Sequence, residues 1–284
     1  MADGLGILEI ILLMTDEFKP EAIIDFRPTT WFKQMILYII SPLFILYYIL
    51  PVLCKRRDNF SITNIPLSGD KQVASGKKFS LKDMKRSAKD LGVSMNDLAA
   101  GALSRGLTEY LKEIGDPHQG PMAAMVPVNL RTKKAMKPND IKLQNNFILL
   151  LLDFHIGASL ESEVKRINKV MKQAKNSVKP IATMFIQQLI IRFLPIFITR
   201  PLMDYTAGKC TLAFSNVPGF KEELTVLGSK ANDLLFFTPS MSKIGLGVSM
   251  ISHVDYFKMG ISADTNVLKD PALLLSKIEE NVQK

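Results

Sequence analysis

The chain has 284 residues, of which 47% are hydrophobic and 22% are charged. This composition excludes a disordered polymer and is sufficient for one large or two medium domains. The formal net charge is +9, but the basic residues are scattered and the longest basic run is Lys55-Arg56-Arg57. We therefore expect no nucleic-acid partner, because an anionic membrane surface or a small anionic substrate suits this charge at least as well.

Cysteine and histidine are too few and too far apart to build a disulfide framework or a metal site. The chain has two cysteines and three histidines, at Cys54, Cys210, His118, His155 and His253. No two of them have the spacing of metal ligands, and no G-x-S-x-G motif occurs. We expect no metal ion, no serine-hydrolase chemistry and a reducing compartment.

An apolar run from Met35 to Cys54, MILYIISPLFILYYILPVLC, contains no charged residue. As a helix it would be about 30 Å long, which is the thickness of the hydrocarbon core of a bilayer. A single crossing would separate the two flanking segments, and no second clean span follows. Pro42 and Pro51 can each break a helix. We therefore expect a monotopic hairpin or an in-plane anchor, with a single crossing and a buried core helix as alternatives.

Helix start signals recur along the rest of the chain. Ser80 and Ser94 each precede an Asp by three residues, which predicts capping boxes and helices over 80–92 and 94–115. The apolar spacing over 159–178 predicts another helix, and Asp270 before Pro271 predicts the last one. Residues 181–202 are apolar but interrupted by polar side chains and Pro195, which favours an amphipathic or channel-lining helix.

Six segments have the composition of strands: Met122–Asn129, Phe147–Phe154, Thr211–Ser215, Leu234–Phe237, Leu246–Ser252 and Tyr256–Ser262. The second is a nearly continuous apolar run, which predicts burial on both faces. Asp58–Lys78 is polar and predicts a linker. Strands that alternate with helices indicate an α/β or α+β fold.

Several polar or turn-forming residues are candidates for binding a ligand. Asn96, at a helix start, and Asn216, in a predicted turn, can each donate and accept hydrogen bonds. Pro218-Gly219 predicts a sharp bend where the backbone can approach a ligand. Arg131 is expected either to bind an anion or to pair with a carboxylate. The structural alternative is that Asn96 caps a helix and that the Pro-Gly pair only makes a turn.

Five spaced segments follow one another in a recognisable order: Val93-Ser-Met-Asn96-Asp97, Pro127-Val-Asn-Leu-Arg131, Asn145-Asn146, Phe214-Ser-Asn216-Val-Pro218-Gly219 and Ile261-Ser-Ala-Asp264. This order resembles the wax ester synthase and diacylglycerol acyltransferase family, which has the chloramphenicol-acetyltransferase-like fold. The opening Met1-Ala-Asp3-Gly4, which by itself predicts a helix start, also resembles the tail of the family's His-His-x-x-x-Asp-Gly motif. The resemblance covers nearly the whole chain.

The resemblance implies a chloramphenicol-acetyltransferase-like α/β lobe with a mixed sheet and packed helices. It implies transfer of an acyl group from acyl-CoA, as substrate, to diacylglycerol or a fatty alcohol, without a cofactor. In the family, the second motif histidine is the general base. The sequence contains no His-His pair, so we expect the base to lie upstream and the chain alone to have little or no activity. The resemblance assigns substrate binding to Asn96, Asn216 and Arg131, and structural roles to Asp3, Gly4, Asp97, Pro218 and Gly219.

The expected domain organisation has four parts: residues 1–30 as a remnant of an N-terminal lobe, 31–57 as a membrane-associated segment, 58–120 as linker and helices, and 121–284 as an acyltransferase C-terminal domain. Membrane lipids are expected partners, and the cytosolic face of the endoplasmic reticulum or a lipid droplet is the expected location. The alternative is a non-catalytic, membrane-anchored lipid-binding or assembly protein. No oligomeric state follows from the sequence.

Overall fold

The computed structural model describes residues 3–24, 35, 39, 41–131, 133–143, 146–177, 179–239 and 242–283. In this part of the chain a seven-stranded mixed sheet has the order β1-β9-β8-β5-β3-β4, with the short β2 also paired to β9. The three inner strands β8, β5 and β3 are parallel, whereas the outer pairs are antiparallel. The strands are β1 (Lys71–Ser75), β2 (Phe79–Ser80), β3 (Gly120–Asn129), β4 (Phe147–Ile156), β5 (Leu212–Pro218), β8 (Leu246–His253) and β9 (Tyr256–Asp264).

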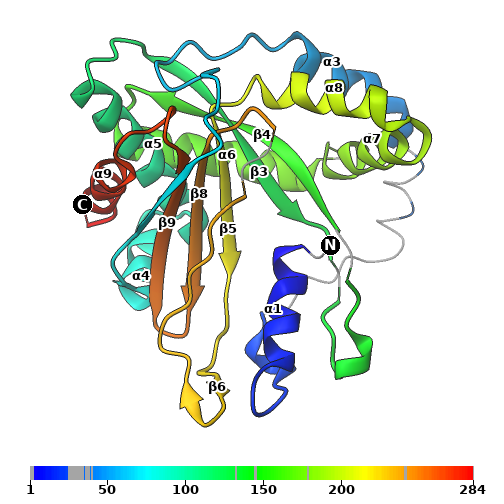
Figure 1. Ribbon diagram of the computed structural model, residues 1–284, viewed down its shortest axis with the longest axis vertical. Helices are drawn as coiled ribbons and strands as arrows, with labels where there is room; N and C mark the ends of the chain where they lie inside the picture. The colour runs from blue at the N-terminus through cyan, green and yellow to red at the C-terminus, as the bar shows by residue number, and fades with distance from the viewer. Residues whose placement is uncertain are drawn as a thin grey trace.

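Long helices pack on one face of this sheet (Figure 1): α4 (Leu81–Asp90), α5 (Met95–Glu113), α6 (Leu160–Asn176) and α9 (Pro271–Gln283). Their predicted start signals are confirmed. The Ser94 hydroxyl accepts a hydrogen bond from the Asp97 amide at 3.2 Å, and Asp270 Oδ1 accepts from the amides of Ala272 and Leu273, each at 3.0 Å. The predicted mixed α/β architecture is therefore the one observed.

The main core lies between this sheet face and the helices. Its largest members include Phe154 and Phe214, whose rings meet edge to face, and Leu103 from α5. Small residues let α5 approach its neighbours closely. A Cβ on Gly106 would lie 2.8 Å from the Ile278 Cα on α9, so this helix contact requires glycine.

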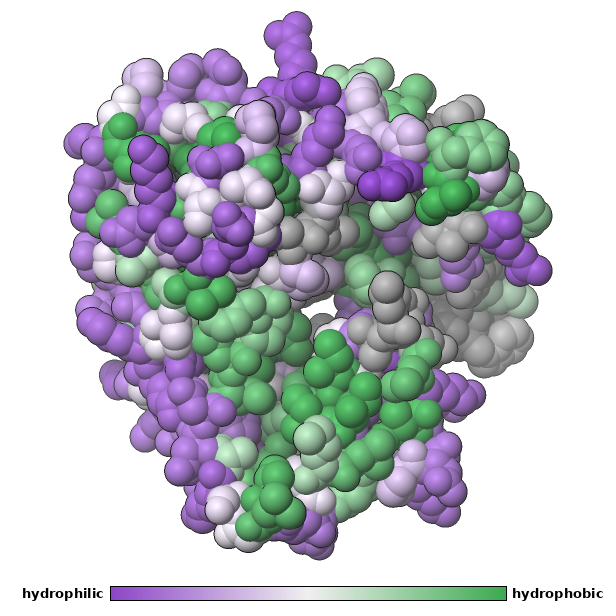
Figure 2. All heavy atoms as spheres, in the orientation of Figure 1, coloured by the Kyte–Doolittle hydropathy of each residue, from purple (hydrophilic) through white to green (hydrophobic). Residues whose placement is uncertain are grey.

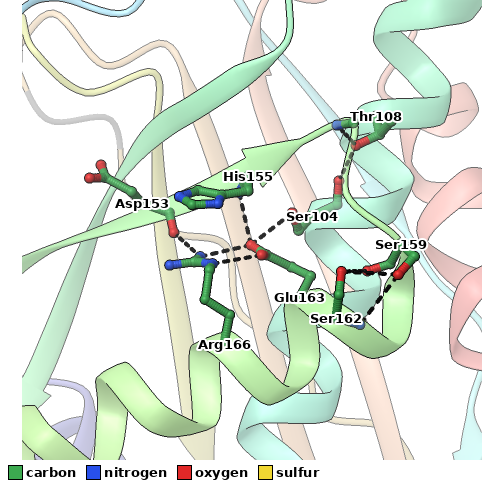
Figure 3. Close-up of polar contacts among 9 residues, drawn as sticks. Ser104, Thr108, Asp153, His155, Ser159, Ser162, Glu163 and Arg166 are labelled. Atoms are coloured by element: carbon green, nitrogen blue, oxygen red, sulfur yellow. Dashed lines mark hydrogen bonds and ion pairs between the residues drawn. The ribbon is translucent and has the colours of Figure 1, made fainter.

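Glu163 on α6 ties the sheet edge to two helices (Figure 3). Its Oε1 accepts hydrogen bonds from the His155 amide at 2.8 Å and from the Ser104 hydroxyl at 3.2 Å. Arg166 forms an ion pair with the same carboxylate at 2.7 Å and also donates to the Asp153 carbonyl of β4. Burial alone would raise the pKa of Glu163, but the Arg166 and His155 hydrogen bonds outweigh it and hold this pKa below its ordinary value.

The apolar run beyond Met35 contains a 3-10 helix, η2 (Ser41–Phe44), and then α3 (Ile45–Cys54), which continues through Pro51. Leu43 and Tyr47 are exposed, so the alternative of a buried core helix is wrong. Within the described ranges, no helix has both the length and the apolar character that a bilayer crossing requires. Residues 36–38 and 40 of the run lie outside the described residues.

Residues 181–202 form parts of two helices rather than one. α7 (Lys179–Phe193) ends before Pro195, which is the N-cap of α8 (Ile196–Ala207). Proline favours this break because it lacks an N–H and restricts the residue before it. Both helices and α3 lie together at one end of the molecule (Figure 1).

Two strand predictions and the predicted linker need correction. Leu234–Phe237 is an irregular segment, because side chains take its backbone groups: the Ser249 hydroxyl donates to the Phe236 carbonyl, and the Leu234 amide donates to the Tyr256 hydroxyl. β4 is an edge strand whose residues alternate between buried and partly exposed, so it is not buried on both faces. The predicted linker contains β1, which the polar composition of Lys71–Ser75 concealed.

The remaining short elements lie around α1 (Gly4–Leu13) or in loops: η1 (Pro20–Ala22), η3 (Pro138–Asp140), β6 (Thr225–Val226) and β7 (Ser229–Lys230). α1 buries Leu5, Leu8 and Leu12 against Phe220 and Leu224. The start of the described chain thus packs on the segment that follows β5. This contact determines where the first residues lie relative to the candidate site.

Candidate functional site

The two candidate asparagines meet although 120 positions separate them. Asn216 Nδ2 donates to Asn96 Oδ1 at 3.0 Å. Asn96 lies in the first turn of α5, and Asn216 lies near the carboxyl end of β5 rather than in the turn that we predicted. Both side chains are partly exposed, so this pair is accessible at the carboxyl end of the inner parallel strands, where α/β sheets commonly bind ligands.

Asp97 fixes the helix start that carries Asn96. Its Oδ2 accepts hydrogen bonds from the Ser94 amide at 3.0 Å and from the Ser94 hydroxyl at 2.6 Å, and also from Asn168 Nδ2 of α6 at 2.7 Å. Asp97 Oδ1 is buried without a hydrogen-bond partner. Through these contacts the Asp97 side chain acts on the backbone of the helix start and on a neighbouring helix.

The start of α1 lies beside the same end of β5. A Cβ on Gly4 would be 3.3 Å from Val217 Cγ2, next to Asn216. Asp3 caps α1, because its Oδ1 accepts from the Gly6 amide at 2.8 Å. Its Oδ2 accepts from Arg131 Nε at 2.9 Å and from the Asn146 amide at 2.9 Å.

Arg131 joins two buried carboxylates. Besides Asp3, it pairs with Glu9 through Nη1 and Oε2 at 2.8 Å, and the whole residue is only 7% exposed. Of the two alternatives for Arg131, the geometry therefore favours carboxylate pairing over anion binding. Glu9 was absent from our candidates, although a single carboxylate inside an apolar helix pattern is itself a signal of a buried partner.

Pro218 and Gly219 end β5 in close contact with β8. The Gly219 amide donates to the Ser252 carbonyl at 2.7 Å, and a Cβ on Gly219 would lie 2.4 Å from that oxygen. The close backbone approach expected at this glycine thus occurs, but the partner is a neighbouring strand. Any larger residue would separate the ends of β5 and β8.

No alternative nucleophile or metal site emerges from the described part of the chain. Burial raises the pKa of the Cys210 thiol to about 12, which leaves it protonated at neutral pH. No group of three or more metal-ligating side chains occurs among the residues described. The accessible surface is hollowed between α1 and the carboxyl end of β5, with apolar side chains along the lower and left edges of the hollow (Figure 2).

A comparison with family models identifies the relatives of this fold. The WS/DGAT C-terminal domain matches residues 143–284, which is half of the chain. The chain belongs to the wax ester synthase/diacylglycerol acyltransferase (WS/DGAT) family. Its mixed α/β architecture is the chloramphenicol-acetyltransferase-like fold, which it shares with a solved WS/DGAT structure.

Among curated WS/DGAT proteins, the chain is 25% identical over 229 residues to O-acyltransferase WSD of Acinetobacter baylyi, covering 78% of this chain and 48% of that protein. It is 25% identical over 236 residues to the probable diacylglycerol O-acyltransferase tgs1 of Mycobacterium tuberculosis, covering 79% and 48%. It is 22% identical over 259 residues to wax ester synthase/diacylglycerol acyltransferase 6 of Arabidopsis thaliana, covering 78% and 49%. The chain thus spans about half the length of these relatives.

Among solved structures, the WS/DGAT of Marinobacter aquaeolei VT8 is similar with a TM-score of 0.61 at 18% identity, covering 99% of this chain and 63% of that one. TRI3 trichothecene 15-O-acetyltransferase of Fusarium sporotrichioides is similar with a TM-score of 0.59 at 12% identity, covering 85% and 52%. The TM-scores show that these proteins share a fold with this chain. At such low sequence identity, the fold is all that the similarity shows.

Proposed function

We propose that this chain supplies the carboxyl-terminal half of an O-acyltransferase of neutral-lipid synthesis. The enzyme would transfer an acyl group from acyl-CoA to the hydroxyl of a diacylglycerol or a fatty alcohol. The meeting of Asn96, Asn216 and the start of α1 at the carboxyl end of β5 is the observation that carries the proposal. The names of the WS/DGAT relatives support these substrate classes.

The Asn96–Asn216 pair suits the chemistry of acyl transfer. The acceptor hydroxyl oxygen attacks the thioester carbon, its proton passes to a general base, and the CoA sulfur leaves. Negative charge develops on the thioester oxygen, and an amide N–H aimed there stabilises it. The NH2 group of Asn216 carries two hydrogens, of which the bond to Asn96 uses one and orients the other.

We propose, as the family resemblance implies, that the general base is a histidine outside the 284 residues, which contain no His-His pair. By resemblance, such a pair would precede Asp3, whose neighbour Gly4 packs against Val217, next to Asn216. The Asp3–Arg131 ion pair would then hold the motif against the loop after β3. Asp3 is thereby a positioning residue and not the proton acceptor.

A fusion protein tests the proposal. The chain would replace the matched half of the Acinetobacter O-acyltransferase WSD, and labelled palmitoyl-CoA would be supplied with dioctanoylglycerol or hexadecanol. We expect ester from the fusion and a rate lower by about 10²–10⁴-fold from the chain alone, since it lacks the base. A fusion that unfolds cooperatively and binds palmitoyl-CoA but forms neither ester would contradict the proposal. Rapid turnover by the chain alone would show that another residue is the base.

We also propose that α3, α7 and α8 form an in-plane membrane-docking surface. Phe193, Ile196 and Phe197 are 70–75% exposed there, and Figure 2 shows apolar side chains at the upper right, over α8. Clustered apolar surface of this kind suits the lipid interface that water-insoluble acceptors require. The cytosolic face of the endoplasmic reticulum or of lipid droplets is the location that fits these substrates.

Vesicle flotation tests the docking surface. Wild-type protein is expected to float with phospholipid vesicles, and Ile196→Ser combined with Phe197→Ser should abolish flotation. Leu227→Ser is the matched control, because Leu227 is 92% exposed but lies at the β6–β7 hairpin, at the opposite end of the molecule (Figure 1). Equal flotation of the double variant and the wild type would exclude this surface as the anchor.

A further inference from the structure

A basic groove of about 1000 Å³ lies where the start of α4, the β8–β9 turn and the segment around Ala231 meet. Its cationic residues are Lys78, Lys82 and Lys85. Two acidic residues, Glu223 and Asp255, also line it. The Glu223 carboxylate is already paired with Lys230 at 2.6 Å, so the groove has an excess of positive charge.

The geometry of α4 adds to this charge. Ser80 is its N-cap, so the positive end of the helix dipole faces the groove from the side of Lys82 and Lys85. Lys78 is held in place, because its Nζ donates to the Asn232 carbonyl at 2.6 Å and lies 4.5 Å from the Tyr256 ring centroid. Lysines beside a helix N-terminus are a common arrangement for binding phosphate.

A buried histidine in the groove wall independently points to a ligand. His253 is 2% exposed, and neither ring nitrogen makes a hydrogen bond of normal geometry. Its ring packs edge to face against Phe220 and Tyr256. Burial lowers its pKa below the ordinary value, although the nearby Phe220 and Ala231 carbonyls partly oppose this. Buried polar atoms are rarely left without a partner, so a polar group of a ligand in the groove would have an imidazole nitrogen in the groove wall to bond.

The groove lies at the same end of the sheet as the candidate site. Ser252, next to His253, accepts the hydrogen bond from Gly219, three residues beyond Asn216. Both features therefore occupy the carboxyl ends of β5 and β8. By contrast, α4 lies far from α3, α7 and α8 (Figure 1), so a ligand in the groove would approach from the aqueous side.

We propose that this groove binds the phosphates at the adenosine end of acyl-CoA, with Lys82 and Lys85 as the phosphate-contacting residues. The proposal rests on the acyl-transfer function above. The 3′-phosphate and the 5′-diphosphate of the coenzyme supply the negative charge that the lysines and the helix N-terminus match. The pantetheine arm would then run toward Asn216.

Calorimetric titration of the full chain tests this assignment with four probes: coenzyme A, dephospho-coenzyme A, pantetheine and phosphatidylglycerol vesicles. The variant carries Lys82→Ala and Lys85→Ala together. The matched control carries Lys169→Ala and Lys172→Ala, two exposed lysines with the same spacing on α6. Thermal melting confirms that both variants fold.

We expect the groove variant to bind coenzyme A about 10- to 100-fold more weakly than wild type, and the control to match wild type. Dephospho-coenzyme A should bind more weakly than coenzyme A, and pantetheine should not distinguish the variants. Unchanged coenzyme A affinity in the groove variant, or no coenzyme A binding by the wild type, would overturn the assignment. Loss of vesicle binding alone would identify a lipid headgroup as the ligand and also overturn it. An inactive fusion that still binds coenzyme A through Lys82 and Lys85 would overturn only the transferase function.

Discussion

Asn216 Nδ2 lies 3.0 Å from Asn96 Oδ1, and this hydrogen bond joins the end of β5 to the start of α5. The bond restricts the direction of the Asn216 amide, which is the group that we propose faces the thioester oxygen. Asp97, next to Asn96, holds the start of α5 against α6, and Gly219, three residues after Asn216, holds the end of β5 against β8. The pair therefore combines an accessible amide with a rigid support.

Asn216→Ala in the Acinetobacter fusion is expected to lower kcat by about 10²-fold, because one oxyanion donor is lost. The free energy of unfolding should fall by only about 1 kcal/mol, since a single partly exposed hydrogen bond is removed. Stopped assays and urea titration measure the two effects. Asn59→Ala, which removes an exposed hydrogen bond to His118, is the control. Equal kcat in both variants would rule out a catalytic role for Asn216.

Arg131→Met should destabilise the chain by about 3–5 kcal/mol, because Asp3 and Glu9 would remain buried without their cation. Urea unfolding followed by circular dichroism measures the loss. Arg105→Met provides the comparison, since Arg105 also pairs with a carboxylate, Glu109, but at a more exposed site; it should cost about 1 kcal/mol or less. Similar losses in the two variants would contradict the bridging role of Arg131.

The surroundings of Gly101 and Gly106 on α5 predict which of two alanine variants is less stable. Alanine at either position gains helix propensity by a similar amount. At Gly106 the new Cβ meets the Ile278 backbone at 2.8 Å, whereas at Gly101 it meets mainly the Val164 side chain, at 2.2 Å. Gly106→Ala should therefore lower the free energy of unfolding more than Gly101→Ala, because a helix backbone cannot move aside as a side chain can. The loss at Gly106 should reach or exceed the range of about 1–3 kcal/mol that is typical of overpacking. Thermal unfolding of the two variants checks the order, and the reverse order would contradict it.

Glu163 predicts a pH dependence of stability. Its folded pKa lies below the ordinary value of 4.5, so its charge stabilises the fold fully above that value. The contribution is lost as the pH falls from 4.5 through the lower folded pKa. Glu163→Gln should therefore be less stable than wild type at pH 7, and the difference should shrink below pH 4.5.

The control for this pH effect is Glu161→Gln on the same helix. Glu161 also pairs with a cation, Lys165, and that pairing lowers its pKa, but both side chains are more than 60% exposed. Solvent screens such a pair, so its substitution should change the free energy of unfolding little at any pH. A pH-independent difference between wild type and Glu163→Gln, measured by urea unfolding from pH 3 to 7, would contradict the assigned role.

Local chemistry determined a large part of this structure. The helix starts at Ser80, Ser94, Ser159 and Asp270 follow from side chains that reach amides two or three residues away, and such short-range bonds are readable in any sequence. The apolar periods of the long helices and most strands follow in the same way. The family resemblance also lay within linear motifs.

Tertiary structure alone decided the partners of the polar residues. Arg131 pairs with two carboxylates more than 100 positions away. The three lysines line the same groove as His253 only because the start of α4 lies beside the end of β8. The sequence also predicts a linker where the structure has the strand Lys71–Ser75, and a strand where Leu234–Phe237 is irregular. In each case the deciding contact joins segments distant in the chain, and the free energy of such contacts depends on a geometry that composition and spacing do not contain.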